Sequence, residues 1–326
     1  MYDSFNRKID YLRFSVTDRC DLRCKYCMPV NNKFTNKKDM LSLINMKNII
    51  NIFLKIGFKK IKITGGEPLV RKDIIEFLRF IGNKVRNREL DEVSLSTNGS
   101  LLKKLYLNIA ECNVKRVNVS LDSLIPEKYE FITNGGNLNN VVEGIGLLKK
   151  SDVKIKINTV LLKNFNIDEL INLIVWCSNN NYDISFIETM PIGETGTSRN
   201  LQYFSSQKAK EIISKEFFLK KSNYNTPGPS RYFYSDKINC RIGFISPISE
   251  NFCTSCNRVR VTSDGVLFTC LGQNHSFDMK KYLDSSKNRV LLYKVKEMIF
   301  NKPEKHFFQI NDSKTPLKRF MNHTGG

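Results

Sequence analysis

The chain has 326 residues, of which 41% are hydrophobic, so it can bury a large core without needing disulfides or structural metals. Its 52 lysine and arginine residues against 32 aspartate and glutamate residues give a formal net charge of +20. Such a charge suits nucleic acid, an anionic membrane surface or a phosphorylated small molecule. Because lysine, asparagine and isoleucine are abundant throughout, we interpret most of this charge as compositional bias. The polar N-terminus and the lack of a long apolar run predict a soluble cytoplasmic protein without a signal peptide or membrane span.

Short apolar segments alternate with longer helical patterns from residue 13 to residue 188. The apolar segments predict buried strands at residues 12–16, 61–64, 93–96, 117–121, 155–160 and 184–187. Helical periodicity between them predicts helices at residues 46–56, 74–85, 103–112, 141–150 and 167–179. Six strand–helix repeats predict an α/β fold, an incomplete (β/α)6 TIM-type barrel, with its chemistry at the C-terminal ends of the strands.

The pattern changes after Met190, where glycine, threonine and proline gather at residues 191–197 and again at 226–230. We therefore predict a barrel domain over residues 1–200 and a smaller C-terminal region over residues 201–326. Within that region the sequence predicts helices and short β-like pieces at residues 208–217, 242–245, 259–269 and 288–300.

The nine cysteines include two tight groups of three, a spacing typical of metal ligation in a reducing compartment. The first group, Cys20, Cys24 and Cys27, directly follows the first predicted strand. Three thiolates can ligate three irons of a cubane cluster and leave the fourth iron open to an exogenous molecule. The alternative is a zinc knuckle, although structural zinc sites prefer four protein ligands.

Two further features accompany the first cysteine group. Tyr26 lies between its second and third cysteines, and the sequence Gly-Gly-Glu-Pro at residues 65–68 follows the second predicted strand. Together with CxxxCxxC, they resemble the radical S-adenosylmethionine superfamily. The resemblance implies that the open iron chelates the methionine moiety, and that cluster reduction releases a deoxyadenosyl radical that abstracts hydrogen from a substrate. It also implies that Tyr26 packs near the adenine and that the glycines let the backbone approach the ligand.

The second cysteine group is Cys253, Cys256 and Cys270, again one ligand short of a closed site. It predicts either a second cluster with an open iron or a zinc ribbon, the latter completed by Cys240 or His275 or lacking a ligand. Arg258 and Arg260 alternate along a predicted strand, so both side chains lie on one face and suit a polyphosphate. We interpret Cys112, Cys177 and Cys240 as buried structural thiols.

With two such groups the chain resembles the GTP 3',8-cyclase family of molybdenum cofactor biosynthesis over nearly its whole length. The similar segments are residues 11–20, 63–71, 96–99, 118–123, 156–160, 186–191, 253–260 and the terminal Gly325–Gly326. The resemblance implies two 4Fe–4S clusters and S-adenosylmethionine as cofactors. It further implies that the second cluster binds the guanine of GTP, that a 5'-deoxyadenosyl radical abstracts ribose H3', and that the ribose carbon closes onto C8 of the base.

The resemblance also assigns residues. Contacts to S-adenosylmethionine fall on Tyr26, Gly66, Ser120 and Met190. Contacts to GTP fall on Arg13, Lys62, Ser96, Lys156, Arg258, Val259 and Arg260. Catalytic roles fall on Arg258, Arg260, Gly325 and Gly326, with the di-glycine tail reaching into the active site. Lys62 stands where many relatives have arginine and Ser96 where threonine is commoner, and residues 202–236 resemble the family too weakly to assign.

The expected partners are GTP, an electron donor such as flavodoxin or ferredoxin, and a downstream cyclic pyranopterin monophosphate synthase. We expect no nucleic acid or membrane partner, and the resemblance allows a homodimer. Two alternatives stay open from the sequence. One is a radical S-adenosylmethionine enzyme that modifies RNA or a peptide, and the other is a zinc-stabilised nucleic-acid-binding module that is not an enzyme.

Overall fold

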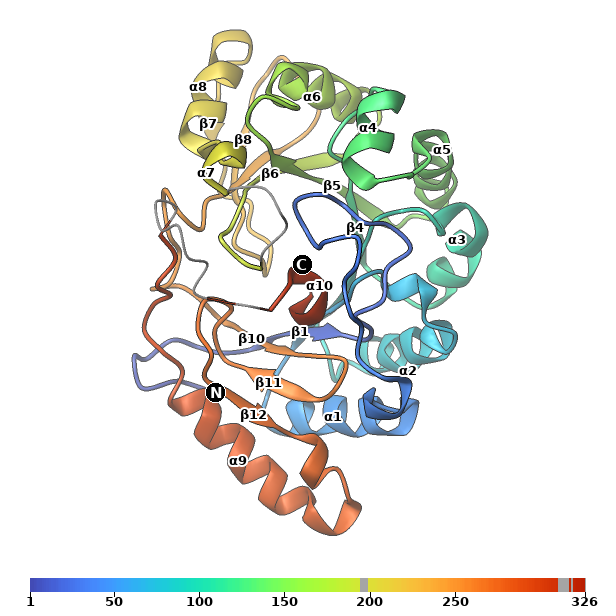
Figure 1. Ribbon diagram of the computed structural model, residues 1–326, viewed down its shortest axis with the longest axis vertical. Coiled ribbons are helices and arrows are strands. Elements are labelled where there is room, and N and C mark those ends of the chain that lie inside the picture. Colours follow the sequence, from blue (N-terminus) through green and yellow to red (C-terminus); the bar gives the residue numbers. More distant parts are fainter. Residues whose placement is uncertain (194–198, 310–316, 318, 326) are drawn as a thin grey trace.

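The computed structural model describes residues 1–193, 199–309, 317 and 319–325. Six parallel strands form the centre of one curved sheet: β1 (Tyr11–Ser15), β2 (Lys60–Thr64), β3 (Glu92–Thr97), β4 (Arg116–Ser120), β5 (Lys154–Leu161) and β6 (Asp183–Glu188). Helices connect them: α1 (Leu43–Lys55), α2 (Ile74–Arg86), α3 (Leu102–Glu111), α4 (Pro126–Thr133), α5 (Leu138–Lys149) and α6 (Leu170–Asn179). These helices lie outside the sheet (Figure 1), which confirms the predicted incomplete barrel.

Each central strand divides its side chains between two environments. In β1, Leu12 and Phe14 are fully buried in the core beneath the helices, whereas Arg13 between them points into the curve of the sheet. The helices carry local signals that set their ends. The Ser42 hydroxyl accepts a hydrogen bond from the backbone N–H of Asn45 at the start of α1 (3.2 Å), and Gly57 adopts a φ of +93° just beyond its end.

The C-terminal part of the chain adds strands to both ends of the same sheet. At one end β10 (Arg258–Val261) pairs parallel with β1, followed by β11 (Val266–Phe268) and β12 (Ser276–Asp278). At the other end β9 (Ile242–Ile245) pairs parallel with β6, followed by β8 (Arg231–Tyr234) and β7 (Lys220–Lys221). Over the described residues the sheet therefore has twelve strands and stays open. The domain boundary after residue 200 stays a prediction.

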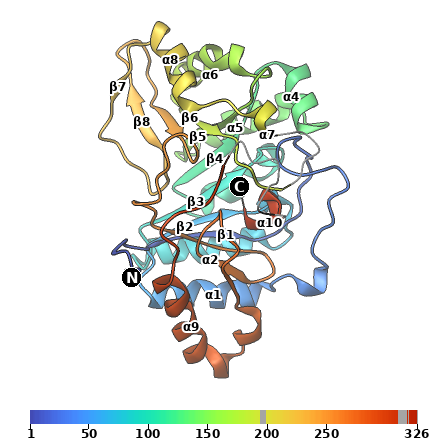
Figure 2. The same ribbon diagram turned by 60° about the vertical axis from the view of Figure 1, so that its left-hand side comes forward.

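The remaining helices lie around this extended sheet. They are α7 (Arg199–Gln202), α8 (Ser206–Glu216), α9 (Asn288–Phe300) and α10 (Met321–Thr324). Both views place α10 and the C-terminus within the curve of the sheet (Figures 1 and 2). In the described part of the chain no helix combines the length and apolar character needed to cross a bilayer.

Besides short elements such as β12 and α10, which were not predicted, two segments differ in form from the sequence predictions. The β-like piece expected at residues 259–269 is a hairpin of β10 and β11, because Gly265 adopts a φ of +90° and turns the chain. Two helices, rather than one, follow β4. The unpredicted α4 has Pro126 in its first turn and ends at Asn134 in the left-handed conformation, both of which are ordinary helix boundary signals.

Candidate active site

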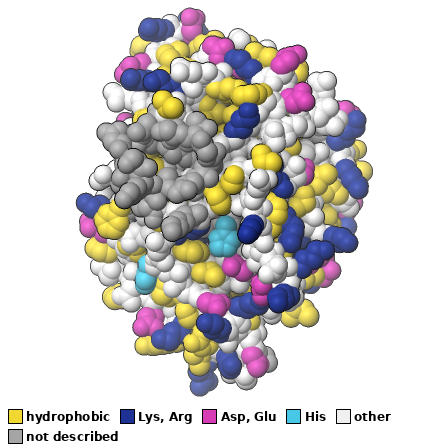
Figure 3. All heavy atoms as spheres, viewed as in Figure 1, with side chains coloured by type: hydrophobic (Ala, Val, Ile, Leu, Met, Phe, Trp, Pro, Cys, Tyr) yellow, Lys and Arg dark blue, Asp and Glu magenta, His cyan; other side chains and the backbone are white. Residues whose placement is uncertain are grey.

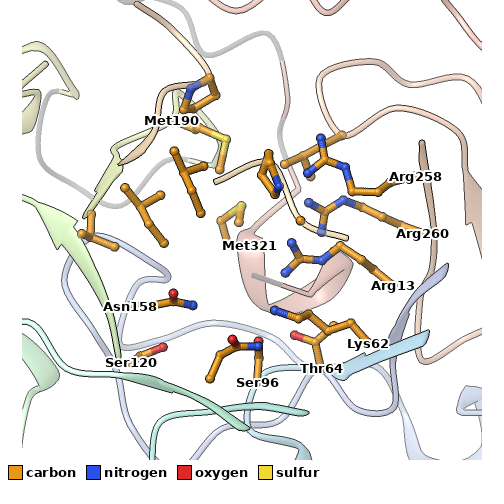
Figure 4. Close-up of a pocket in the computed structure, with 18 of the residues that line it drawn as sticks. Arg13, Lys62, Thr64, Ser96, Ser120, Asn158, Met190, Arg258, Arg260 and Met321 are labelled. Atoms are coloured by element: carbon orange, nitrogen blue, oxygen red, sulfur yellow. The ribbon is translucent and has the colours of Figure 1, made fainter. Parts of the chain in front are cut away.

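A cavity of about 310 Å³ lies within the curve of the sheet, at the C-terminal ends of the central strands. Most residues that the sequence assigned to the site line it: Arg13, Cys20, Cys24, Tyr26, Cys27, Lys62, Gly66, Ser96, Ser120, Lys156, Met190, Cys253, Cys256, Arg258, Arg260 and Cys270. Figure 4 shows the arginines at 13, 258 and 260 with Lys62 on one side, and Ser120, Asn158 and Met190 across from them. One cavity thus contains both cysteine groups.

Two predicted residues do not line the cavity, and a third falls outside the described residues. The Val259 side chain is 1% exposed and belongs to the hydrophobic core, because it points to the face of β10 opposite Arg258 and Arg260. A contact from Val259 to a ligand would have to come from its backbone. Gly325 does not line the cavity, although its carbonyl accepts a hydrogen bond from Arg260. Gly326 lies outside the described residues.

The loop of the first cysteine group is held by the last turn of α4. The backbone N–H groups of Arg23 and Lys25 each donate to a carbonyl of that turn at 3.0 Å, and the N–H of Cys27 donates to the carbonyl of Cys24 at 2.9 Å. Burial raises the pKa of Cys20 to about 12 and that of Cys24 well above its ordinary value. Three soft thiol donors at one end of a cavity match the ligand set of an iron–sulfur cluster.

Gly65 and Gly66 fit a close crossing of two loops. A Cβ atom at Gly65 would lie 2.6 Å from the carbonyl oxygen of Thr17, and one at Gly66 would lie 2.3 Å from that of Arg19. The N–H of Gly66 also donates to the Thr17 carbonyl (2.7 Å). The resemblance to the superfamily accounts for these glycines by a close approach of the backbone to a ligand. The structure adds a second reason, since any side chain here would push apart the segment that leads into Cys20.

The Glu67 carboxylate ties the same loop to the end of β3. It accepts hydrogen bonds from the N–H of Leu69 (2.9 Å), the N–H of Asn98 (2.6 Å) and the hydroxyl of Thr97 (2.8 Å). Burial raises its pKa to about 7, and these three hydrogen bonds oppose the rise. The loop at residues 65–68 is therefore fixed from both sides.

Tyr26 is positioned by a buried carboxylate. Its hydroxyl donates to Asp122 Oδ2 at 2.7 Å, while Asp122 Oδ1 accepts from the N–H of Val160 at 2.8 Å. Burial raises the pKa of Asp122 to about 6, and both hydrogen bonds oppose the rise. The ring of Tyr26 is thereby held at the cavity wall between β4 and β5.

The second cysteine group lies among cations. Burial alone would raise the pKa of Cys256. The positive charges of Arg258 and Lys302 outweigh that effect and lower the pKa to a net value of about 6. The buried Lys302 ammonium donates to the carbonyl of Thr269, next to Cys270. Positive charge around a thiol favours its thiolate form, which is the form that binds metal.

The two residues that the sequence offered as a fourth ligand for the second cysteine group, Cys240 and His275, lie away from the cavity. Cys240 lies under α6, with its thiol 3.9 Å from the carbonyl of Ile174, and His275 faces Thr269; neither lines the cavity. In the described part of the chain no three His, Cys, Asp or Glu side chains converge on a single ion. A cubane cluster presents a separate iron to each of three thiolates, so its ligands need not converge on one point.

A row of cations crosses three neighbouring strands in register. Arg260 on β10 pairs with Arg13 on β1, which pairs with Lys62 on β2. Burial lowers the pKa of Lys62 well below its ordinary value, and Arg13, Arg116 and Lys156 lower it further. Burial, then Arg13, likewise lowers the pKa of Arg260. Such clustered buried cations repel one another, and a bound polyanion would relieve that repulsion.

Comparison with known proteins decides the family. Residues 14–177 match the Radical SAM superfamily, and residues 182–308 match the Molybdenum Cofactor Synthesis C family. Proteins named GTP 3',8-cyclase from Brucella ovis and Brucella abortus are both 42% identical to this chain over 329 aligned residues, covering 100% of the chain and 96% of each relative. The chain belongs to the GTP 3',8-cyclase family.

Solved structures show the same fold. The Streptococcus suis protein SuiB, in a crystal structure with S-adenosylmethionine, superposes on the chain with a TM-score of 0.64 at 16% identity, covering 95% of this chain and 78% of SuiB. SuiB bound to the precursor peptide SuiA superposes equally well, at 15% identity. At these identities the likeness concerns the radical SAM fold alone.

The described part of the C-terminal tail enters the cavity of this GTP 3',8-cyclase family member. Met321 and Asn322 line the cavity, and the Asn322 amide donates to the carbonyl of Asp18 (2.8 Å). Gly325 has a φ of +77°, and a Cβ there would lie 2.3 Å from Thr64 Cγ2. Position 325 therefore needs glycine for its conformation and for the space available.

Several residues of the family site were missed by sequence reasoning. Arg116, Asn158 and Lys302 line the cavity, as do Thr226 and Ser230 from the unassigned segment. Asn158 had a usable signal, because it alternates with Lys156 on one face of β5. Arg116 had a similar signal, because it lies on the same face of β4 as Ser120. Lys302, Thr226 and Ser230 had none, since their proximity depends on how distant parts of the chain meet.

Proposed function

We propose that the protein is a radical S-adenosylmethionine enzyme that converts GTP to (8S)-3',8-cyclo-7,8-dihydroguanosine 5'-triphosphate in molybdenum cofactor biosynthesis. The observation that carries this proposal is the shared cavity. Two incomplete cysteine groups and an in-register row of cations line one space, as a reaction between a cluster-bound cofactor and a phosphorylated substrate requires.

In this proposal the first cysteine group holds a 4Fe–4S cluster, and the residues around it hold S-adenosylmethionine. When bound, they supply a 5'-deoxyadenosyl radical able to abstract H3' from the substrate ribose. Tyr26, fixed by Asp122, and Gly66, fixed by the crossing loop, offer the cofactor rigid surfaces. Ser120 and Met190 complete its contacts from the ends of β4 and β6.

The second cysteine group would hold the auxiliary 4Fe–4S cluster that binds guanine, with Arg258 beside Cys256 (3.7 Å between Nη2 and Sγ). The triphosphate would lie against Arg13, Lys62, Lys156 and Arg260, where its negative charge offsets their mutual repulsion. Ser96 offers a hydroxyl to the same ligand, and Val259 offers its backbone.

The proposed catalytic residues are Arg258, Arg260, Gly325 and Gly326. Arg260 donates to the carbonyls of Thr324 (3.3 Å) and Gly325, so this guanidinium contacts both the tail and the cavity. A substrate that recruits Arg260 would therefore compete with, or rearrange, the tail contact.

The proposal also implies partners. Reduction of the first cluster needs an electron donor such as flavodoxin or ferredoxin, and a downstream cyclic pyranopterin monophosphate synthase would consume the product. A cytoplasmic location and a homodimer belong to the same proposal.

The test is an anaerobic reaction of the reconstituted protein with dithionite, S-adenosylmethionine and GTP. We expect brown protein with about eight irons per chain, deoxyadenosine, and the cyclised nucleotide. Deoxyadenosine without that nucleotide would reject GTP as substrate while retaining the radical chemistry. Colourless, zinc-rich protein after anaerobic reconstitution would reject both and favour the nucleic-acid-binding module.

A further inference from the structure

The buried Lys156 ammonium is hydrogen-bonded to a neutral hydroxyl rather than to a carboxylate. Its neighbour in register on β6 is Asp183, but the Asp183 carboxylate is engaged by Arg241, at 3.0 Å and 3.2 Å from Nε and 3.1 Å from Nη2. The Lys156 ammonium instead donates to the hydroxyl of Tyr232 at 2.8 Å. A hydroxyl fixes the ammonium without neutralising it, and leaves two N–H donors for another ligand.

Tyr232 is itself held in place on β8. It is 2% exposed, and its ring stands edge-on to that of Tyr224, with 5.0 Å between ring centroids. The Arg241 guanidinium covers the Tyr224 ring at 3.8 Å, and the Thr226 hydroxyl lies 3.4 Å from the Tyr232 hydroxyl. The phenol therefore has a fixed position behind the cavity wall.

The segment before Tyr232 forms part of that wall. Thr226, Gly228, Pro229 and Ser230 line the cavity. The Ser230 hydroxyl contacts the Ser185 hydroxyl of β6 at 2.8 Å. A Cβ at Gly243 would lie 2.1 Å and 2.3 Å from these two hydroxyl oxygens, so the contact exists only because position 243 is glycine. The segment before Tyr232 is thus anchored to β6 at Ser185, which pairs in register with Asn158 on β5.

We propose that Tyr232 is a positioning residue that holds the Lys156 ammonium, in its charged form, where the triphosphate of the substrate binds. The inference rests on the proposed function, because it takes GTP as the ligand of this cavity. Tyr232 is not among the residues that line the described cavity, so it acts through Lys156.

The electrostatic surroundings make this hydrogen bond important. Burial and, after it, Arg116 on β4 lower the pKa of Lys156, Asp183 on β6 partly opposes them, and the net value is about 7. Lys62 on β2 is a further cation close to Lys156. Because an acceptor for the ammonium favours its charged form, removing the Tyr232 hydroxyl lowers the pKa of Lys156 again.

The test measures GTP binding by equilibrium dialysis to the cluster-loaded protein, without reductant, from pH 6 to pH 8. A charged Lys156 is lost as the pH rises through its pKa, so Tyr232→Phe shifts that loss to lower pH. A further decrease of about one pKa unit makes GTP binding roughly tenfold weaker than wild type at pH 8 and about twofold weaker at pH 6.

Tyr234→Phe is the matched control, since Tyr234 lies on the same strand but is 41% exposed. Its binding should match wild type at every pH.

A double-mutant cycle with Lys156→Gln separates positioning from general damage. We expect Tyr232→Phe to cause no further loss of GTP binding in the Lys156→Gln background, and S-adenosylmethionine binding to stay unchanged. Equal losses in both backgrounds, a parallel loss of S-adenosylmethionine binding, or wild-type GTP binding by Tyr232→Phe would each overturn the inference. Binding of guanosine, which lacks the phosphates, distinguishes this inference from the proposed function. If the wild type binds GTP more tightly than guanosine and Tyr232→Phe binds GTP as the wild type does, only the inference fails. If the wild type binds both equally, the proposed function itself fails.

Discussion

Single residues near the first cysteine group are constrained mainly by the protein's own backbone. Gly66 leaves no room for a methyl group, because a Cβ would lie 2.3 Å from the carbonyl of Arg19. Gly146 on α5 is half-buried, and a Cβ atom there would meet no other atom within 4 Å. Substitution by alanine should therefore change the stability of the protein in opposite directions at these two positions.

Gly66→Ala should lower the free energy of unfolding by about 1–3 kcal/mol, because the loop crossing must open to fit the methyl group. Gly146→Ala should raise it by about 0.5–1 kcal/mol, since alanine is the better helix residue. Urea denaturation of the two variants measures both effects. Equal changes in stability would contradict the steric account.

Tyr26→Phe probes the hydrogen bond to Asp122. Asp122 in the folded protein has a pKa of about 6, above its ordinary value of 3.8. The folded state therefore keeps a proton that the unfolded state loses, and Asp122 lowers the free energy of unfolding as the pH rises across this window. The Tyr26 hydroxyl limits that loss by bonding the carboxylate. We expect Tyr26→Phe to cost about 1.5–3 kcal/mol at pH 7.5 and clearly less at pH 5.

Unfolding in urea at the two pH values measures the difference, with Tyr2→Phe as the control because Tyr2 is 57% exposed. A cost that is independent of pH would show that the Tyr26 hydroxyl contributes equally whether Asp122 is charged or neutral, which contradicts this account.

Local patterns in the sequence predicted the cysteine groups, the glycine motif and the pair Arg258 and Arg260. The other predicted cavity cations, Arg13, Lys62 and Lys156, were assigned by the resemblance to a known family. The direction of Val259 could also have been read, since Arg258 and Arg260 occupy the other face of the strand. Lys302 and Tyr232 could not, because each meets the site only through contacts between distant segments.

At the scale of elements, the second cysteine group depends on the first few residues of the chain. Arg7 is paired with the buried Asp3 carboxylate at 2.6 Å and donates to the carbonyls of Cys253 (2.9 Å), Pro303 (2.8 Å) and Glu304 (2.6 Å). One guanidinium thus fastens the N-terminal segment, the cysteine loop and the segment after α9. Nothing in the sequence near Arg7 indicates this role.

Asp3→Asn should therefore destabilise the protein by about 3–5 kcal/mol, because it leaves a buried guanidinium without its counter-charge. Under the proposed function it should also reduce reconstituted iron from about eight to about four per chain by weakening the second site. Iron analysis and urea denaturation measure these effects. Glu76→Gln, which breaks the exposed pair with Lys47, is the control and should change stability by less than about 1 kcal/mol. Full iron content in Asp3→Asn would contradict a role for Arg7 in holding the second cysteine group.

At the scale of the whole molecule, the tail brings the end of the chain back to the second strand of the barrel. Gly325→Ala places a methyl group against Thr64 Cγ2, so we expect turnover in the anaerobic assay to fall more than about tenfold. Adding Thr64→Ser removes that methyl of threonine and should restore part of the turnover, the φ of +77° limiting the recovery. Cluster content should be unchanged in both variants. Undiminished turnover in Gly325→Ala, or in a chain lacking residues 325 and 326, would contradict a role for the tail in catalysis.

The pairing of β1 with β10 has a consequence for the synthesis of the chain. Tyr11 pairs with Arg258, so one edge of the first strand stays unpaired until a segment almost 250 residues later has been synthesised. At ribosomal rates of roughly 5–20 residues per second, that interval is on the order of 12 to 50 s. During it, β1 presents an edge of unpaired backbone N–H and C=O groups that other chains could pair with. Such long-range pairing also raises the contact order, which slows folding.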